Sequence, residues 1–348
     1  MTEPRLLFFF NGMPEYEALF PIARRLKQRG LVEPICFSPS EVLRREPRLK
    51  PIVAASRLDF TIRPSRWLKL FPKQWLKRGD AAISMVDPTM DGSSTRPRSL
   101  AMLELGIPTI FVQHGVMQGK LNLSSDKRNI HYQSQLLLLF EDLIIPDILS
   151  PETREKLAIV GFIKPLLFPP CPPKLPLPKH DRAILFCHSF RWAGRYGEED
   201  VARFYDLVRR FAAAHQNDLI IIRSHRGKSR ALYRAHDKAL SDVPNVVFSH
   251  AYRGPLSGMS MTDVLGLADA CISTASTAVL DGVYMDVPMA IYENDQPVFQ
   301  GLPNITGIDD VEFFVSNLSR TDLAEIRSHY GDVEKNIEKC CDAIEKVM

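Results

Sequence analysis

Hydroxyl side chains gather in one short stretch, ISTASTAVLDGVYMDVPMAIYEND, which covers residues 272–295. Four of them stand between an apolar run and a helical pattern: Ser273, Thr274, Ser276 and Thr277. Hydroxyls and backbone N–H groups at a helix start favour anions, and Asp281 follows one helical turn later. A helix cap needs only one hydroxyl. We therefore expect this turn to bind the phosphates and ribose of an activated donor, with ordinary capping as the alternative.

Two histidines follow apolar runs that are typical of buried strands. His114 ends PTIFVQH and precedes Gly115, a residue that permits a tight turn or close ligand approach. His225 ends DLIIIRSH beside Arg223, in a compact basic turn. Histidine suits proton transfer near neutrality, and guanidinium groups suit phosphate oxygens. The alternatives are a histidine that caps a neighbouring loop and a solvated basic loop.

Three carboxylates also follow strand-like runs in the first half of the chain: Asp87, Asp91 and Glu15. A carboxylate in such a place can act as general base or nucleophile. Turn chemistry explains most of the pattern at the two aspartates, and anionic residues favour helix starts in any case. We keep the three as alternative acid–base groups.

A basic, tryptophan-containing segment runs from Arg57 to Arg78. Its cations interleave with apolar residues, as in segments that lie on anionic lipid. Pro72 interrupts it, so we expect two short helical pieces. The alternative is a helix that covers its own domain, with Lys and Arg stems turned outward. The residues expected to contact a membrane are Arg66, Trp67, Lys69, Lys73, Trp75 and Lys77.

The bulk composition is that of a globular protein. The chain has 348 residues and a formal net charge of only +3, so nucleic-acid binding is not expected from the overall field. The six cysteines have no metal-ligand spacing, and no metal site is predicted. No stretch approaches ~18 apolar residues and no signal-peptide core is evident, which favours a cytoplasmic protein.

Strand and helix patterns alternate along the chain, which predicts an α/β fold with two doubly wound parallel sheets. Apolar runs at 5–10, 32–38, 81–86 and 108–112 alternate with helical patterns in the first half. A proline-rich stretch, PLLFPPCPPKLPLP, then reads as a connector. The expected organisation is a Rossmann-like domain at 1–164, a linker at 165–180, a second Rossmann-like domain at 181–320 and a C-terminal helix at 321–348.

Taken together, these residues resemble the CDP-glycerol glycerophosphotransferases, which build polymers of the teichoic-acid type. ADACISTASTAVLDGVYMDVPMAIYENDQPVF is similar to the C-terminal signature of that family, and ILFCHSFR is similar to the strand that ends its donor loop. RSHRG and VQHGV stand where the family has its two histidines. The resemblance implies a GT-B fold with an interdomain cleft for a cytidine nucleotide, either CDP or CMP. Related capsule enzymes that use CMP-Kdo or CMP-sialic acid share these signatures.

The expected function is transfer of a glycosyl or polyol-phosphate group from a cytidine nucleotide to a cell-surface glycan or lipid-linked acceptor. No further cofactor is expected. The catalytic residues would be His114 and His225, and the enzyme would work at the inner face of the cell membrane. A CMP-Kdo or CMP-sialic acid transferase and a non-catalytic protein of polymer export remain as alternatives. The expected donor-binding residues are Gly115, Ser189, Arg191, Arg223, Ser273, Ser276, Thr277 and Asp281.

Overall fold

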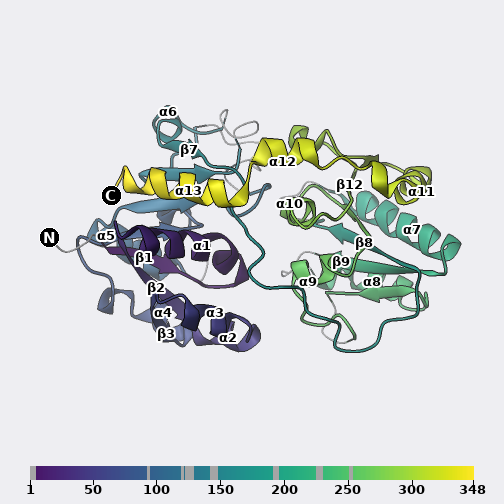
Figure 1. The fold of residues 1–348 in the computed structure, drawn as a ribbon, viewed down its shortest axis with the longest axis horizontal. Helices are drawn as coiled ribbons and strands as arrows, with labels where there is room; N and C mark the ends of the chain where they lie inside the picture. Colours follow the sequence, from purple (N-terminus) through teal and green to yellow (C-terminus); the bar gives the residue numbers. More distant parts are fainter. Residues whose placement is uncertain are drawn as a thin grey trace. The chain divides into compact units, whose positions relative to one another are not determined.

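The chain folds into two compact α/β units (Figure 1). The structure is a computed structural model, and it describes residues 5–91, 95–118, 121, 129–141, 148–190, 196–224, 230–250 and 254–348. The first unit consists of Met1–Phe168 with Tyr330–Met348, and the second of Pro169–His329. The chain therefore passes from the first unit to the second and returns near its end.

The first unit is built on a seven-stranded parallel sheet with the order β3-β2-β1-β4-β5-β6-β7. Its strands are short apolar runs, as strands covered on both faces must be. The order changes direction between β1 and β4, which is the switch point of a doubly wound sheet. The strands are β1 Arg5–Phe9, β2 Glu33–Pro39, β3 Asp59–Arg63, β4 Ala81–Ser84, β5 Thr109–Val112, β6 Leu136–Leu139 and β7 Leu157–Ile159.

Helices connect these strands and end where the sequence supplies a stop. Helix α1 ends at Gly30, which adopts the left-handed conformation (φ 70°) and donates its N–H to the Leu26 carbonyl. Gly106 ends α5 in the same conformation (φ 64°). The elements are α1 Met13–Arg29, α2 Ser40–Arg45, α3 Leu49–Ala55, α4 Ser65–Leu70, η1 Pro72–Gln74, η2 Pro88–Met90, α5 Arg96–Leu105, α6 Pro151–Arg154 and α13 Val333–Glu345.

The second unit repeats the plan with a six-stranded parallel sheet in the order β10-β9-β8-β11-β12-β13. Its switch point lies between β8 and β11. The strands are β8 Arg182–His188, β9 Asp218–Ser224, β10 Val246–Phe248, β11 Ala270–Ser273, β12 Met289–Tyr292 and β13 Asn304–Ile305. The helices are α7 Glu198–Ala214, α8 Arg230–Leu240, α9 Met261–Leu265, α10 Thr277–Val283, η3 Pro297–Phe299, α11 Ile308–Ser316, η4 Leu318–Arg320 and α12 Ala324–Tyr330.

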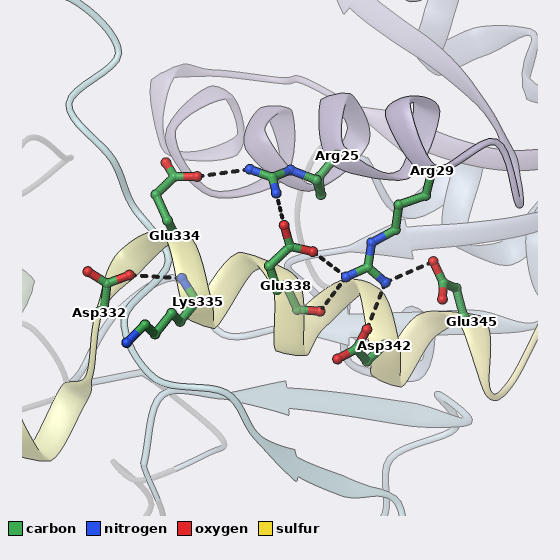
Figure 2. Close-up of polar contacts among 8 residues, drawn as sticks. All are labelled: Arg25, Arg29, Asp332, Glu334, Lys335, Glu338, Asp342 and Glu345. Carbon is green, nitrogen blue, oxygen red and sulfur yellow. Dashed lines mark hydrogen bonds and ion pairs between the residues drawn. The ribbon is translucent and has the colours of Figure 1, made fainter.

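The last helix, α13, packs beside α1 in the first unit (Figures 1 and 2). Arg25 and Arg29 of α1 face a row of carboxylates on α13, among which Glu338 pairs with both arginines. The remaining pairs join Arg25 to Glu334 at 3.0 Å and Arg29 to Asp342 at 2.7 Å and Glu345 at 3.0 Å. A network of this kind contributes more than an isolated surface pair. The C-terminal segment thus completes the first unit.

A buried amide fixes the point where the chain returns to the first unit. Asn336 Nδ2 donates to the carbonyl oxygens of Phe162, at 2.9 Å, and Tyr330, at 2.7 Å. Gly161 has φ 94°, and a Cβ there would lie 2.3 Å from the Tyr330 carbonyl oxygen. Only glycine fits this approach.

The proline-rich stretch is extended, because proline cannot continue a helix or pair within a sheet. No helix or strand occurs between Ile159 and Arg182, a range that the structure describes throughout. Its later part is attached to the second unit: Cys171 N–H donates to Asp263 Oδ1 at 2.8 Å. Among the described helices, none has the length and apolar character needed to cross a membrane.

Candidate functional site

The hydroxyl turn follows β11 at the switch point of the second sheet. Ser273 and Thr274 are fully buried. The Ser273 hydroxyl donates to the Thr274 carbonyl at 2.8 Å, and the Thr274 hydroxyl accepts from the Ser189 N–H at 3.0 Å. These two hydroxyls hold the turn together. Ser273 is therefore a structural residue, which corrects its expected contact with the donor.

Ser276 and Thr277 are the partly exposed hydroxyls of the same turn. Helix α10 begins at Thr277, and the backbone of Ser276 is extended (φ −163°, ψ 171°). The Ser276 hydroxyl makes no capping hydrogen bond to the helix and lies 3.3 Å from the Ser273 hydroxyl, so helix capping does not explain it. Asp281 is partly buried one turn further along α10. The structure thus brings these three residues together beside the ends of β8 and β11.

Arg223 holds loops of the second unit together. It lies in β9 and is buried, with 8% of its surface exposed. Its guanidinium donates to Ser249 Oγ at 3.2 Å and to the Met259 carbonyl at 3.3 Å. These bonds fix the segment that follows β10 and the loop before α9, which gives Arg223 a structural role. Arg191 and His225, the other two expected phosphate contacts, lie outside the described residues.

A buried polar network in the second unit escaped the sequence analysis. Asp237 on α8 accepts from Tyr205 OH at 2.8 Å and lies 2.8 Å from His250 Nε2. The Ser224 N–H donates to His250 Nδ1 at 3.1 Å, so the imidazole proton lies on Nε2. His188 Nε2 is 3.2 Å from Tyr205 OH. The network joins the ends of β8 and β9 to α7 and α8, and no sequence motif predicts it.

The switch point of the first sheet carries a second group of polar side chains. Arg98 of α5 donates through Nη1 to Asn11 Oδ1 at 3.1 Å, and Asn11 Nδ2 donates to Glu15 Oε1 at 3.2 Å. The Arg98 guanidinium also stands 4.0 Å from the centre of the Phe9 ring. Only 7% of Arg98 is exposed, and no partner for its Nε exists among the described residues. Arg98 was not expected to belong to a site.

Burial shifts the pKa values of both charged members of this group. It raises the pKa of Glu15, and the hydrogen bond from Asn11 and the charge of Arg98 partly oppose this rise. It lowers the pKa of Arg98 to about 10, against the attraction of Glu15 and Asp91. Desolvation disfavours both charged forms, whereas the opposite charge favours them. Glu15 is therefore a more basic carboxylate than an exposed glutamate.

Asp87 and Asp91 are occupied by hydrogen bonds and nearly inaccessible, each with 1% exposed. Asp87 caps η2 through the Thr89 N–H at 3.1 Å and accepts from the Ser134 N–H at 2.9 Å and hydroxyl at 2.8 Å. Asp91 accepts from hydroxyls in the segment that begins α5, at 2.7 and 2.8 Å. Turn chemistry accounts for both, and neither is placed to act as an acid or base.

His114 lies just beyond β5, partly buried. Its N–H donates to Gln118 Oε1 at 3.2 Å, while its ring Nδ1 is buried with no partner among the described residues. Burial and then the charge of Lys164 lower the pKa of His114 to about 4, partly opposed by a hydrogen bond to the Met85 backbone. The imidazole is therefore neutral near pH 7. The adjacent Gly115 carbonyl accepts from Gln113 Nε2 at 2.9 Å.

The first part of the basic segment lies in β3, and the later part forms α4 and η1, separated at Pro72 as expected. Trp75 belongs to the core, because only 8% of it is exposed. The centre of its ring lies 4.5 Å from the ring centre of Phe37 and 5.5 Å from that of Phe9. This corrects its expected contact with a membrane. The exposed apolar side chains of the segment are Leu70, with 55% exposed, and Phe71, with 46%. Sequence reasoning could not tell these residues from the core ones.

The cations near Leu70 and Phe71 in the sequence make this surface predominantly basic. Arg66, Lys73 and Lys77 are exposed, and Lys69 is partly exposed. No carboxylate occurs between Phe60 and Gly79 in the sequence. Lys73 reaches Glu104 on α5 at 2.5 Å, with more than half of each side chain exposed. We call the exposed apolar residues and these four cations the basic apolar surface.

No three His, Cys, Asp or Glu side chains come together as metal ligands do in the part of the chain that the structure describes.

Comparison with known proteins shows the fold. No family model matches the chain, and no curated protein matches it. Solved structures match over nearly its whole length at low identity. A UDP-GlcNAc 2-epimerase from Neisseria meningitidis bound to UDP-GlcNAc is 12% identical, covering 98% of this chain and 100% of its own, with a TM-score of 0.61.

Two further solved structures are similar. A glycosyltransferase from Rickettsia africae is 10% identical over 100% of this chain and 99% of its own, with a TM-score of 0.56. A variant of the wall teichoic acid polymerase TagF, soaked with CDPG, is 10% identical over 99% of this chain and 88% of its own, with a TM-score of 0.52. With its two Rossmann-like units, the chain has the GT-B fold.

Proposed function

We propose that this chain is a transferase that moves a glycosyl or polyol-phosphate group from a cytidine nucleotide to a glycan or lipid-linked acceptor. The observation that carries the proposal is the turn after β11, where Ser276 and Thr277 are partly exposed and the Ser276 hydroxyl does not cap α10. In open α/β sheets, ligands bind beyond the carboxyl ends of the strands at the switch point. Proteins of the same fold were solved with UDP-GlcNAc and with CDPG.

The proposed donor site lies in the second unit. Ser276 and Thr277 bind the phosphates, and Asp281, one turn further on, binds the ribose. Ser189 and Thr274 are positioning residues, because their bond joins the ends of β8 and β11. Arg191 and His225, which match the family signatures in sequence, stabilise the charge of the leaving nucleotide.

His114 contributes from the first unit as a neutral hydrogen-bonding group. An imidazole whose pKa is lowered to about 4 is a weak proton acceptor. This shift favours a hydrogen-bonding role over removal of a proton. A neutral ring can still donate one hydrogen bond and accept another.

We also place the enzyme at the inner face of the cell membrane. A lipid-linked acceptor lies at the bilayer, and the basic apolar surface suits an anionic leaflet. Leu70 and Phe71 would enter the headgroup layer while the surrounding cations pair with lipid phosphates. Leu70 and Phe71, which are exposed, thus take the membrane-contacting role that was expected of Trp75.

A panel of donors tests the proposed function. Thermal stability is measured with CMP, CDP and UDP, and donor turnover with CDP-glycerol, CDP-ribitol, CMP-Kdo, CMP-sialic acid and UDP-GlcNAc. We expect stabilisation by a cytidine nucleotide and turnover of a cytidine donor. Turnover of CMP-Kdo or CMP-sialic acid alone would select the alternative donor class. Epimerisation of UDP-GlcNAc without transfer, or nucleotide binding without any turnover, would overturn the proposal.

A further inference from the structure

The switch point of the first sheet carries a polar cluster that the proposed donor site does not use. There β1 and β4 are neighbours, and α1 and α5 follow them in the chain. Helices on the two sides of such a point lie on opposite faces, which leaves a crevice at the carboxyl ends of the strands. Arg98 from α5 reaches Asn11 after β1, and Asn11 reaches Glu15 in the first turn of α1. The cluster therefore links α5, the residue after β1 and the first turn of α1 at this switch point.

We propose that this cluster binds the acceptor, a polyol or sugar hydroxyl, and that Glu15 takes the proton from that hydroxyl. Asn11 and Arg98 are positioning residues for Glu15. This inference rests on the proposed transfer reaction and adds its acceptor site and its base.

The geometry selects Glu15 among the three carboxylates that the sequence offered as acid–base groups. Asp87 and Asp91 are 1% exposed and engaged by several hydrogen bonds each. Glu15 is partly exposed, and it accepts a hydrogen bond from an exposed residue, Asn11. A base must reach the proton that it abstracts, and partial exposure gives Glu15 that access.

Arg98 has a hydrogen-bond donor that its structural contacts do not use, and this donor could bind a ligand. It is a buried cation whose Nε–H has no partner in the described part of the chain. A buried donor without a partner costs stability, and an oxygen of a bound acceptor would satisfy it. The unused donor and the partly exposed carboxylate then address the same ligand from α5 and α1.

The charges around Glu15 suit a proton acceptor. Burial raises its pKa, while Arg98 from α5 and the Asn11 amide keep the ionised form accessible. Asp91 is the next charge on the α5 side and attracts Arg98. On α1 itself, Glu17 lies 3.6 Å from Lys164. A raised pKa increases the basicity of a carboxylate, which brings it nearer to the pH at which it must work.

The step conserves atoms and electrons. The acceptor hydroxyl gives its proton to the Glu15 carboxylate, and its oxygen forms a bond to the transferred carbon or phosphorus. The bond from that atom to the leaving oxygen of the nucleotide breaks, and the leaving oxygen keeps the electron pair. No oxidant or reductant takes part.

Glu15→Gln in the full chain is the principal test, with the best donor of the panel and with water or added glycerol as the acceptor. We expect turnover to fall roughly 100-fold or more, the scale of general-base catalysis, while the thermal shift by CDP is unchanged. The variant without ligand should remain folded but lose some stability, because the buried Arg98 loses an opposite charge. Normal turnover, or loss of the thermal shift by CDP together with loss of turnover, would overturn the proposal.

Asn11→Ala tests the catalytic role of Glu15 through the pH–rate profile, which would not change if the role of Glu15 were purely structural. Asn11 is exposed, so its loss leaves the core intact, and its hydrogen bond lowers the pKa of Glu15. The acidic limb of the pH–rate profile should therefore move to higher pH in this variant. Glu33→Gln changes a partly buried carboxylate at the opposite end of the sheet and should leave the profile in place. An unmoved limb in Asn11→Ala would exclude Glu15 as the base.

A titration separates failure of this inference from failure of the proposed function. The side-chain carboxyl resonance of Glu15, assigned with the Glu15→Gln variant, is followed against pH without any nucleotide, and the expected midpoint lies above that of exposed glutamates. Glycerol at high concentration should shift this resonance in the wild type. A raised midpoint without donor turnover would refute the transfer reaction alone. An ordinary midpoint and no response to glycerol would refute the acceptor site alone.

Discussion

The backbone N–H of Ser189 donates to the hydroxyl of Thr274, 3.0 Å away, and so joins the ends of β8 and β11 at the switch point of the second sheet. Thr274 is fully buried, and its own N–H donates to the Cys187 carbonyl at 3.1 Å. The hydroxyl turn therefore has a fixed position relative to β8. A ligand gripped by that turn depends on this bond, although the bond itself is inaccessible.

Thr274→Val should destabilise the protein by about 1–3 kcal/mol, because it leaves the buried Ser189 N–H without its acceptor. Denaturant unfolding measures this loss. The affinity for CDP should fall as well, since the hydrogen bond that holds the turn against the end of β8 is lost. Thr274→Ser keeps the hydroxyl and should retain most of both. Equal stability of the Val and Ser variants would contradict the structural role of the bond.

The partly exposed hydroxyls should behave in the opposite way. Replacing Ser276 and Thr277 together by Ala should leave the unliganded melting temperature within a few degrees of wild type but remove the stabilisation by CDP or CMP. The matched control is Ser260→Ala, which removes a hydroxyl that caps α9 through the Asp263 N–H at 3.1 Å. This control should cost about 1 kcal/mol and keep the nucleotide shift. An unchanged shift in the double variant would remove the turn from the donor site.

His114 should make stability depend on pH at the acidic side. The folded pKa is about 4, below the ordinary 6.5, so the unfolded chain takes up a proton first as the pH falls. Stability is therefore lost between about pH 6.5 and pH 4, on the order of 1 to 3 kcal/mol for a partly exposed ring. Urea unfolding of wild type and His114→Gln at pH 7 and pH 4.5 measures this difference. If both proteins lose the same amount, the ring is not held neutral.

The basic apolar surface predicts reversible binding to anionic vesicles. Each cation near an anionic surface contributes roughly 1 kcal/mol, and salt screens it. Co-sedimentation should be strong with anionic vesicles at low salt, weak with neutral ones and reversed by high salt. Replacing Arg66, Lys69, Lys73 and Lys77 by Glu should abolish binding and spare activity on a short water-borne acceptor.

The apolar contribution to this binding has its own variant and control. Leu70→Ser with Phe71→Ser should weaken binding about tenfold or more without unfolding the protein, because both side chains are half exposed. Phe313→Ser removes an apolar side chain with 66% exposed from α11 of the second unit and should change nothing. If the wild type does not bind anionic vesicles at low salt, the basic apolar surface has no membrane role and its helices only cover their own domain.

The sequence by itself determined the architecture and the places where polar groups meet strand ends. Apolar runs alternate with helical patterns, and helix stops such as Gly30 and Gly106 stand where α1 and α5 end. These signals are local, because period and chain punctuation depend on neighbouring residues. The order of the runs then predicts parallel strands whose carboxyl ends carry Glu15, His114 and Ser276.

Only the tertiary structure decided which of these side chains is hydrogen-bonded or covered by other residues. Asp87 is engaged by Ser134, 47 residues away, and Thr274 by Ser189, 85 residues away. Trp75 is covered by Phe37, whereas the neighbouring Phe71 is exposed. A sequence pattern states what a side chain is but not which distant group lies against it. Burial and pairing come from those distant contacts, and they distinguish Glu15 from Asp87 and Asp91.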